Sequence, residues 1–362
     1  MEKIDGKKWS YDIIVNGVWF LMAFSVNNRR YTGCKAKLTD WIRQTILKNC
    51  KNCDSFCDIF AGTSVVTEKM INDFSEFFIN DFLFSNEMIY KAFYLKQDYS
   101  EEKIYKYASK YNSYNVDSLE NNYFNINFGD KFFSNNDAKL IGEIREDIEK
   151  NKIFFNEKEY AILLVSLLYS ADRSANTCGH YDAYIKKQNL RSSFKFELID
   201  PVIKSTNDNR DIHISRKDAN LLAKNIKADV VYMDPPYSSR QYSRFYHVLE
   251  NITKWEKPNL YGTALKPAEE NMSEYCKSKA LDAFKDLVYS LDCKYIIVSY
   301  NNTYNSKSNS SKNKMTLEEI KEVLENKGKT KVISKRHKAF NAGSTEFSNH
   351  REYLFITEVG EF

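Results

Sequence analysis

The stretch that decides the fold is "FCDIFAGTSVVTEKMINDFSEFFIND", residues 56–81. Its first apolar run predicts a strand that ends near residues 58–60, and Gly62 follows in a tight turn. Apolar residues spaced four apart over residues 66–74 indicate one face of a helix, and a second apolar run ends at Asp81. Strand, helix and strand in this order form a βαβ unit. Its first turn would present backbone N–H groups to a nucleotide-like ligand, although a glycine here can also serve the turn alone.

The same alternation returns later in the chain. The segment "DIHISRKDANLLAKNIKADVVYMDPPY", residues 211–237, predicts a strand, Asp218, a short helix and a strand that runs into Asp234. Further buried strands are expected at residues 293–302 and 351–359. Polar residues that follow several strands would gather at one edge of a sheet, where open α/β sheets bind their ligands. The expected fold class is therefore α/β, with a Rossmann-like mixed sheet.

Residues 96–205 follow a different pattern. Two helices are expected there, one amphipathic at residues 137–151 and one largely buried at residues 157–173. The region ends in a loop in which Gly179 is followed by interleaved tyrosines and basic residues. This composition is typical of a surface that grips a nucleic-acid backbone, and the alternative is a solvated basic face. We therefore expect a mostly helical insertion within the sheet domain.

The composition limits where a polyanion could bind. Lys and Arg number 53 and Asp and Glu 49, a net charge of +4, so a surface for nucleic acid must be a local patch. Seven irregularly spaced cysteines favour reduced thiols in a cytosol. The apolar run at residues 18–24 is too short to cross a membrane. Residues 1–27 are expected to be an N-terminal extension, and Met22 is an alternative start.

The chemistry of the tetrapeptide "DPPY", residues 234–237, accounts for its place at the end of a strand. Prolines cannot donate to a sheet ladder, so Asp234 and the carbonyl of Pro235 should project beyond the sheet edge. Two such acceptors suit an exocyclic amino group, because bonding both of its protons frees the nitrogen lone pair to attack a methyl group. Tyr237, held beyond Pro235 and Pro236, can stack on the ring. The alternative is a proline-rich strand end followed by a turn.

Together these motifs resemble the adenine-N6 DNA methyltransferases of restriction-modification systems that use S-adenosylmethionine. The resemblance is to the alpha-order, Asp-Pro-Pro-Tyr family, in which the glycine turn comes first, a target-recognition insertion second and Asp-Pro-Pro-Tyr third. The segments "RRYTGCKAKLTDWI" (29–42), "ANTCGHYDAYIKK" (175–187) and "DPPYSSRQYSRFYH" (234–247) also look like elements of this family. The resemblance implies a class I methyltransferase fold from about residue 28 onward.

The resemblance also implies roles for the matching residues. Tyr31 and Lys35 would approach the methionine end of S-adenosyl-L-methionine, Asp81 its ribose and Asp218 its adenine. The expected cofactor-binding set is Tyr31, Lys35, Asp58, Phe60, Gly62, Asp81 and Asp218, and the expected catalytic set is Asp234, Pro235, Pro236 and Tyr237. No metal is required.

The expected substrate is double-stranded DNA whose target adenine swings out of the helix. Arg240 and Arg244 follow the catalytic motif, and their guanidinium groups suit phosphates and base edges. The expected DNA-binding set is Asn176, Tyr181, Lys186, Arg240 and Arg244. A cognate restriction endonuclease is a possible functional partner, no membrane is involved, and the enzyme is expected in the cytoplasm.

Four other features have simpler interpretations. Ser64 stands where the family has a second turn glycine, which costs about 1 kcal/mol if the position needs a positive φ. Ser238 stands where the subgroup often has asparagine. Cys50, Cys53 and Cys57 imitate metal-ligand spacing without a fourth ligand nearby, so no zinc site is expected. His247 is expected to be a hydrogen-bonded helix histidine in preference to a phosphate ligand.

The expected domains are a catalytic domain at residues 28–95 and 206–362 and a target-recognition insertion at residues 96–205. Two other functions stay open at this point. An RNA or protein amide methyltransferase would share the cofactor fold but would not readily explain the insertion. A DNA-binding regulator without activity would keep the insertion, but the intact motif at residues 234–237 argues against it.

Overall fold

A seven-stranded sheet organises the described part of the chain, in the strand order β5-β4-β3-β6-β7-β9-β8. This computed structural model describes residues 13–15, 18–20, 24–186, 189–303, 312–337 and 350–360. The strands are β3 (Ser55–Asp58), β4 (Glu76–Asp81), β5 (Asp211–Arg216), β6 (Lys227–Met233), β7 (Asp292–Asn301), β8 (Gly328–Arg336) and β9 (Arg351–Val359). Neighbouring strands from β5 to β7 are parallel, whereas β9 runs antiparallel to both β7 and β8. This mixed α/β sheet confirms the predicted fold class.

Helices cover both faces of the sheet, because alternate side chains of each buried strand point to opposite sides. In β6, Val230 and Tyr232 join the core that includes α1 (Thr39–Asn49), α2 (Val65–Met70) and α3 (Phe84–Tyr94). Val231 and Met233 join the core that includes the other helices, α8 (Ala219–Ala223), α11 (Ala280–Ser290) and α12 (Leu317–Glu325). The central strands are therefore buried on both faces.

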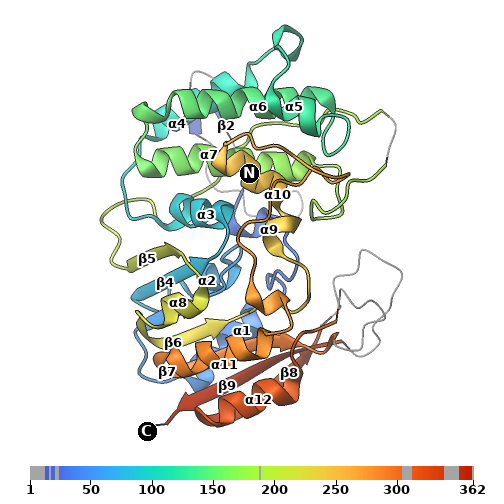
Figure 1. Cartoon of the computed structure of the whole chain (residues 1–362). Helices are drawn as coiled ribbons and strands as arrows, with labels where there is room; N and C mark the ends of the chain where they lie inside the picture. Colours follow the sequence, from blue (N-terminus) through green and yellow to red (C-terminus); the bar gives the residue numbers. More distant parts are fainter. Residues whose placement is uncertain are drawn as a thin grey trace.

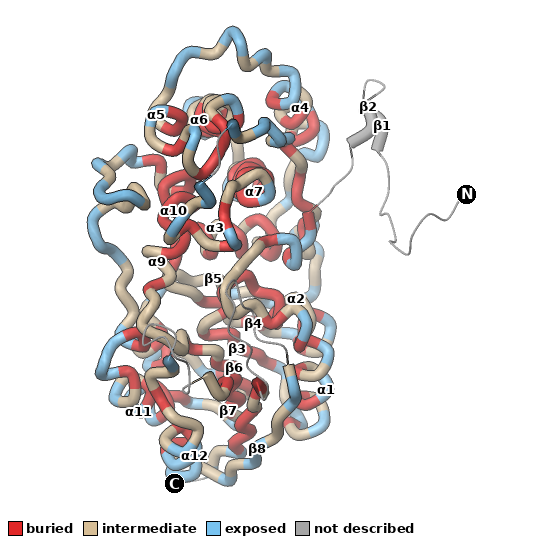
Figure 2. The backbone as a smooth tube through the Cα atoms, turned by 90° about the vertical axis from the view of Figure 1, so that its right-hand side faces the viewer, coloured by how far each residue is buried: buried red, intermediate tan, exposed pale blue. Residues whose placement is uncertain are grey.

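A helical lobe stacks beyond the β5 end of the sheet (Figure 1). It contains α4 (Glu101–Asn112), α5 (Tyr123–Phe128), α6 (Asn135–Lys150), α7 (Glu157–Ser174), α9 (Tyr242–Phe245) and α10 (His247–Lys254). Short 3₁₀ turns lie at η1 (Val26–Asn28), η2 (Val116–Ser118), η3 (Lys152–Phe154) and η4 (Glu274–Cys276). Buried residues of this lobe belong to the same hydrophobic cluster as buried residues of β3, β4 and β6, and Figure 2 shows buried segments in red in both parts. The lobe and the sheet domain thus share a core.

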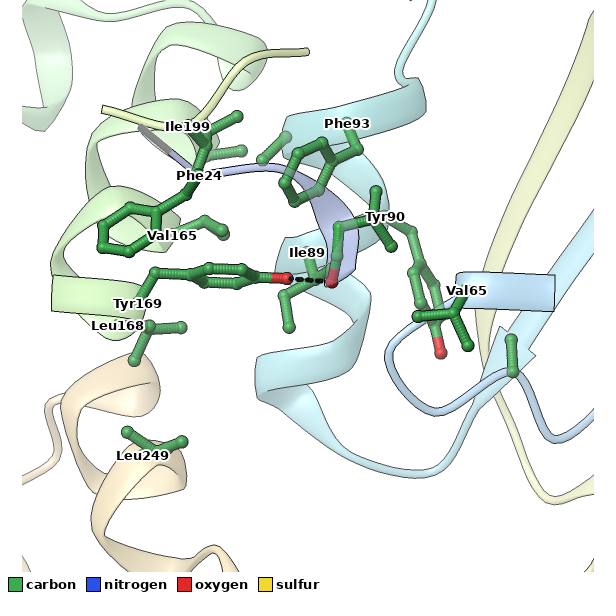
Figure 3. Packing of buried hydrophobic residues seen from close by; sticks show 14 of the residues in the cluster. Phe24, Val65, Ile89, Tyr90, Phe93, Val165, Leu168, Tyr169, Ile199 and Leu249 are labelled. Atoms are coloured by element: carbon green, nitrogen blue, oxygen red, sulfur yellow. Dashed lines mark hydrogen bonds between the residues drawn. The ribbon is translucent and has the colours of Figure 1, made fainter. Parts of the chain in front are cut away.

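The junction between the two parts is built from α3 and α7. Tyr169 of α7 packs against Phe93 of α3 and against Phe24, with ring centroids 6.0 and 5.5 Å apart (Figure 3). The Tyr169 hydroxyl donates a hydrogen bond to the Val26 carbonyl over 3.3 Å. This aromatic contact fixes the helical lobe against the sheet.

Most predicted elements are confirmed, and two details differ. The helix after the glycine turn ends at Met70, so Phe74 lies beyond it, after the turn at residues 71–73. The amphipathic helix α10 follows the Asp-Pro-Pro-Tyr motif yet packs on α3 and α7, so the helical lobe extends beyond the predicted insertion. The segments β1 (Ile13–Val15) and β2 (Val18–Phe20) pair with each other in a separate two-stranded sheet. Within the described residues, no helix has the length and apolar character to cross a membrane.

Candidate active site

A pocket with about 960 Å³ of empty space, part of it open to solvent, lies at the carboxyl ends of the central strands. Neighbours β3 and β6 are parallel, and the chain proceeds from them toward opposite ends of the sheet, so this edge is its topological switch point. All eleven predicted cofactor-binding and catalytic residues line the pocket: Tyr31, Lys35, Asp58, Phe60, Gly62, Asp81, Asp218, Asp234, Pro235, Pro236 and Tyr237.

The glycine turn forms one wall of this pocket. Gly62 has φ +54°, and a Cβ added to it would meet the Tyr31 ring at 3.1 Å, so glycine serves both the backbone and the close packing. The Gly62 N–H donates to Asp81 Oδ2 over 3.0 Å, and the Leu83 N–H donates to Asp81 Oδ1 over 2.9 Å. Asp81 thereby ties the turn to the end of β4.

Ser64 adopts the left-handed conformation, with φ 61° and ψ 22°. The sequence predicted backbone strain at Ser64 if its φ were positive, and the φ is positive. The Ser64 hydroxyl lies 3.1 Å from the Tyr94 hydroxyl and donates to the Thr63 carbonyl over 2.6 Å. These buried contacts offset part of the cost of a non-glycine residue at this position.

Asp58, at the end of β3, presents an unsatisfied acceptor. Its side chain is buried, and Oδ2 accepts a hydrogen bond from the Thr67 hydroxyl over 2.8 Å. Its Oδ1 has no hydrogen-bond partner among the described residues. Burial raises the pKa of Asp58 to about 7, and the charges of Asp234 and Asp81 add to this effect. A buried carboxylate oxygen without a donor fits a cationic group on a ligand.

The carboxylate of Asp234 is the centre of a charged network. Lys35 Nζ lies 2.8 Å from Asp234 Oδ1 and 2.6 Å from Oδ2, and it also donates to the Tyr237 hydroxyl. The Tyr237 hydroxyl donates in turn to Asp234 Oδ1. Burial raises the pKa of Asp234 to about 6, although the Lys35 ammonium opposes this shift. Lys35, expected beside the cofactor, therefore contacts the carboxylate of Asp234 directly.

Comparison with known proteins identifies the family of this chain. Residues 31–283 match the family described as D12 class N6 adenine-specific DNA methyltransferase. The chain belongs to this family. The methyltransferase therefore transfers a methyl group to the N6 amino group of adenine in DNA. Neither an RNA or protein amide methyltransferase nor an inactive regulator fits this family.

Curated relatives agree with this identification. The chain is 31% identical to the Type II methyltransferase M.NlaIII of Neisseria lactamica over 348 residues, 91% of this chain and 98% of that protein. It is 28% identical to the Type II methyltransferase M.CviAII of Paramecium bursaria Chlorella virus 1, over 92% of this chain and 99% of that protein. It is 33% identical to the modification methylase StsI of Streptococcus sanguinis, over 75% of this chain but only 44% of that longer protein. The methyltransferase is thus a site-specific enzyme of the restriction-modification type.

The predicted DNA-binding residues lie outside the pocket lining, and the two segments that carry them are in contact, because the Tyr181 N–H donates to the Phe245 carbonyl over 2.7 Å. Lys186 is exposed. Asn176 uses its amide to donate to the carbonyls of Lys131 and Ile185, over 2.9 and 2.7 Å. The prediction for Tyr181 does not fit the structure, because its side chain is 0% exposed and its hydroxyl donates to Asp172 over 3.1 Å.

One of the two arginines of the set, Arg244, supports a loop. Arg244 Nη1 donates to the Pro267 carbonyl over 2.6 Å, and Arg240 lies over the Phe245 ring at 5.3 Å. His247 lies in α10, as predicted, with its ring nitrogens 3.1 Å from the Arg244 carbonyl and 2.8 Å from the Ala264 carbonyl. Burial lowers the pKa of His247 to about 4. These contacts hold residues 256–275 beside the pocket.

Several pocket residues were missed from the sequence. Gln241 and Ser273 exchange two hydrogen bonds, from Gln241 Nε2 to the Ser273 carbonyl over 3.0 Å and from the Ser273 N–H to Gln241 Oε1 over 2.8 Å. Tyr242 lines the pocket and packs on Tyr31, with centroids 5.2 Å apart. Gln241 and Tyr242 lie in the segment at residues 234–247 that resembles the family, so the sequence did contain a signal for them. Tyr275, which packs edge-on against Phe60 at 5.0 Å, follows no motif.

Asp218 has two roles in the structure. Asp218 lines the pocket but also caps α8, because its Oδ1 accepts from the N–H groups of Asn220 and Leu221.

Cys57 is fully buried in β3, and Cys50 and Cys53 are free thiols. Among the residues whose placement is described, no group of three or more His, Cys, Asp or Glu side chains could hold a metal ion.

Proposed function

We propose that the pocket binds S-adenosyl-L-methionine, which supplies an electrophilic methyl group, together with a target adenine. The single observation that carries this proposal is the meeting of the Gly62 turn, Asp81 and Asp234 in one pocket. The chain would thus be an Asp-Pro-Pro-Tyr methyltransferase of the alpha order.

The residues on the cofactor side fit this ligand. The unsatisfied Oδ1 of Asp58 suits the methionine ammonium group, and Asp81 at the end of β4 suits the ribose hydroxyls. Phe60 and Tyr275 supply an apolar wall near Asp218, which suits an adenine ring. The ring of Tyr31 packs against Gly62 in the turn.

On the substrate side, Asp234 and the Pro235 carbonyl accept the two protons of the target amino group. The nitrogen lone pair is then free to attack, and the positive charge that develops on nitrogen lies beside the Asp234 carboxylate. The Tyr237 ring is held edge-on against Tyr300, with centroids 4.9 Å apart, so its orientation is fixed. We propose that it stacks on the flipped base.

We propose that residues 96–205, at the side of the sheet, supply most of the contacts that read the DNA sequence, because the described part of the catalytic sheet has no element free to enter the major groove. Lys186 is the best-placed cation of the predicted set, since it is exposed. A cognate restriction endonuclease is the proposed functional partner, because relatives of nearly full length are Type II methyltransferases. We place the enzyme in the cytoplasm with its DNA.

The test uses the purified chain and S-adenosylmethionine labelled on its methyl group. Label should transfer to duplex DNA and not to total RNA or to a protein extract. Mass spectrometry of the digested DNA should show N6-methyladenine. Label found in N4-methylcytosine, or in RNA alone, would refute the proposed substrate chemistry.

A further inference from the structure

A buried carboxylate outside the family-matched segment reaches the catalytic network from another strand. Glu352 belongs to β9, beyond residues 31–283, and its side chain is buried. Its Oε1 lies 3.5 Å from Lys35 Nζ and accepts a hydrogen bond from the Ser299 hydroxyl over 2.7 Å. The side chains of Lys35 and Glu352 are 5% and 4% exposed. A carboxylate buried on the strand face that also carries Leu354 and Ile356 is costly unless it is paired, so its presence needs a reason.

The network holds one ammonium group between two carboxylates. Lys35 Nζ contacts Asp234 at 2.6 Å and Glu352 at 3.5 Å, so it lies nearer to Asp234. Lys35 and the Tyr237 hydroxyl together engage both oxygens of Asp234. A target amino group that donates to Asp234 must therefore compete with Lys35. Moving a buried ammonium group away from its only carboxylate is expensive, but moving it toward a second carboxylate is not.

We infer that Glu352 is a positioning residue that takes up the Lys35 ammonium when Asp234 accepts the target amino group. Glu352 acts through Lys35 and touches neither the base nor the methyl donor. This inference rests on the proposed role of Asp234. It gives the active site a way to exchange one donor for another at Asp234 without leaving a buried charge unpaired.

The inference also predicts how the rate depends on pH. Glu352 raises the pKa of Asp234 by charge repulsion, whereas Lys35 lowers it. Removing the Glu352 charge removes this repulsion and draws Lys35 toward Asp234, and both changes lower the pKa of Asp234. The acidic limb of the rate profile should then move to lower pH. The titratable groups around Asp234 and Glu352 are Lys35, Asp58, Tyr232, Tyr237, Tyr242, Tyr300 and His337.

The test compares Glu352→Gln with Glu358→Gln, the same substitution at an exposed position of the same strand. Single-turnover methylation is measured from pH 5.5 to 8 with saturating S-adenosylmethionine and duplex DNA. Glu352→Gln should keep the parental cofactor affinity, slow methyl transfer about 10- to 100-fold and move the acidic limb to lower pH. Glu358→Gln should behave as the parent.

A second control separates this role from simple support of β7. Ser299→Ala removes the other partner of Glu352 but leaves Lys35 in place. If Glu352 acts through Lys35, Ser299→Ala keeps most of the parental rate. A Ser299→Ala rate as low as that of Glu352→Gln would overturn the inference, as would a Glu352→Gln enzyme with the parental rate and pH profile.

If Glu352→Gln does not fold, Glu352→Asp should methylate slowly with an unshifted acidic limb of the rate profile. A parental rate for Glu352→Asp would overturn the inference. A parent enzyme that fails to methylate DNA would instead refute the proposed function.

Discussion

Cofactor binding should depend on the ionisation of Asp58, whose pKa is raised to about 7. If its ionised form receives the cofactor's ammonium group, the apparent Kd scales with the inverse of the ionised fraction. Affinity for S-adenosylmethionine should then rise about five- to sixfold between pH 6 and pH 7.5, because the roughly eightfold gain in ionised Asp58 is partly offset by proton loss from the ligand. The upper limit is set by the ligand, because an α-amino group loses its proton near pH 7.7–8.0.

The perturbation is Asp58→Asn, which keeps the acceptor for the Thr67 hydroxyl but removes the charge. At pH 7.5 this variant should bind S-adenosylmethionine about tenfold more weakly, as expected for a lost charge-assisted hydrogen bond. Its affinity should change less than about twofold over the same pH range. Asp282→Asn, at an exposed position of α11, is the matched control and should retain the parental profile.

Isothermal titration calorimetry in two buffers of different ionisation enthalpy measures both the affinity and the protons released. At pH 7 the parent should release about half a proton on binding, and Asp58→Asn almost none. Identical pH profiles for the parent and Asp58→Asn would refute the reasoning.

Stability offers a second check: the folded pKa of Asp58 lies above the unfolded value near 3.8, so stability conferred by Asp58 is lost as pH rises toward 7. Asp58→Asn should therefore be the more stable protein at pH 8.

Three further predictions follow from single positions. Ser64→Gly should exceed Ser64→Ala by about 1 kcal/mol in the free energy of unfolding by urea, because both lose the hydroxyl but only glycine relieves the positive φ; equal values would mean an unstrained backbone. Tyr237→Phe should slow methylation about tenfold because it loses its contacts with Lys35 and Asp234, and Tyr237→Ala should cost a further 10-fold or so through lost stacking. Parental turnover in Tyr237→Ala, or no change in the fluorescence of a 2-aminopurine target base, would contradict the stacking role. Lys186→Ala should reduce the salt dependence of DNA binding by about one phosphate contact, whereas Arg244→Ala should not, because Arg244 binds the Pro267 carbonyl; equal changes in slope would show that Arg244 meets phosphate.

The sheet and its pocket could be predicted because their signals are local. An apolar run, a glycine turn and a polar residue at the strand end follow each other within residues 56–81. Parallel strands finish at the same edge, so residues as distant as Asp58 and Asp234 necessarily meet there. This is why eleven residues chosen from sequence line one pocket.

The rest depends on tertiary contacts that leave no local pattern. Glu352 reaches Lys35 only through the pairing of β9 with β7, in which it lies opposite Asn301. Tyr181 sits in a basic and aromatic segment, but composition does not show which rings point inward. From the sequence, Arg244 was expected to contact the DNA. Its partner in the structure, the Pro267 carbonyl, could not be foreseen because it lies in a loop that only the fold brings beside Arg244. An amphipathic helix such as α10 likewise does not reveal which surface it covers.

The central claim is that Asp234 holds the target amino group and does not hold the cofactor. It is tested most directly by measuring single-turnover methylation and S-adenosylmethionine affinity on the same preparation of Asp234→Ala. The account predicts a rate constant lower by about 10³, with cofactor affinity and duplex binding within about threefold of the parent. A parental rate constant, or a rate loss explained entirely by weaker cofactor binding, would contradict it.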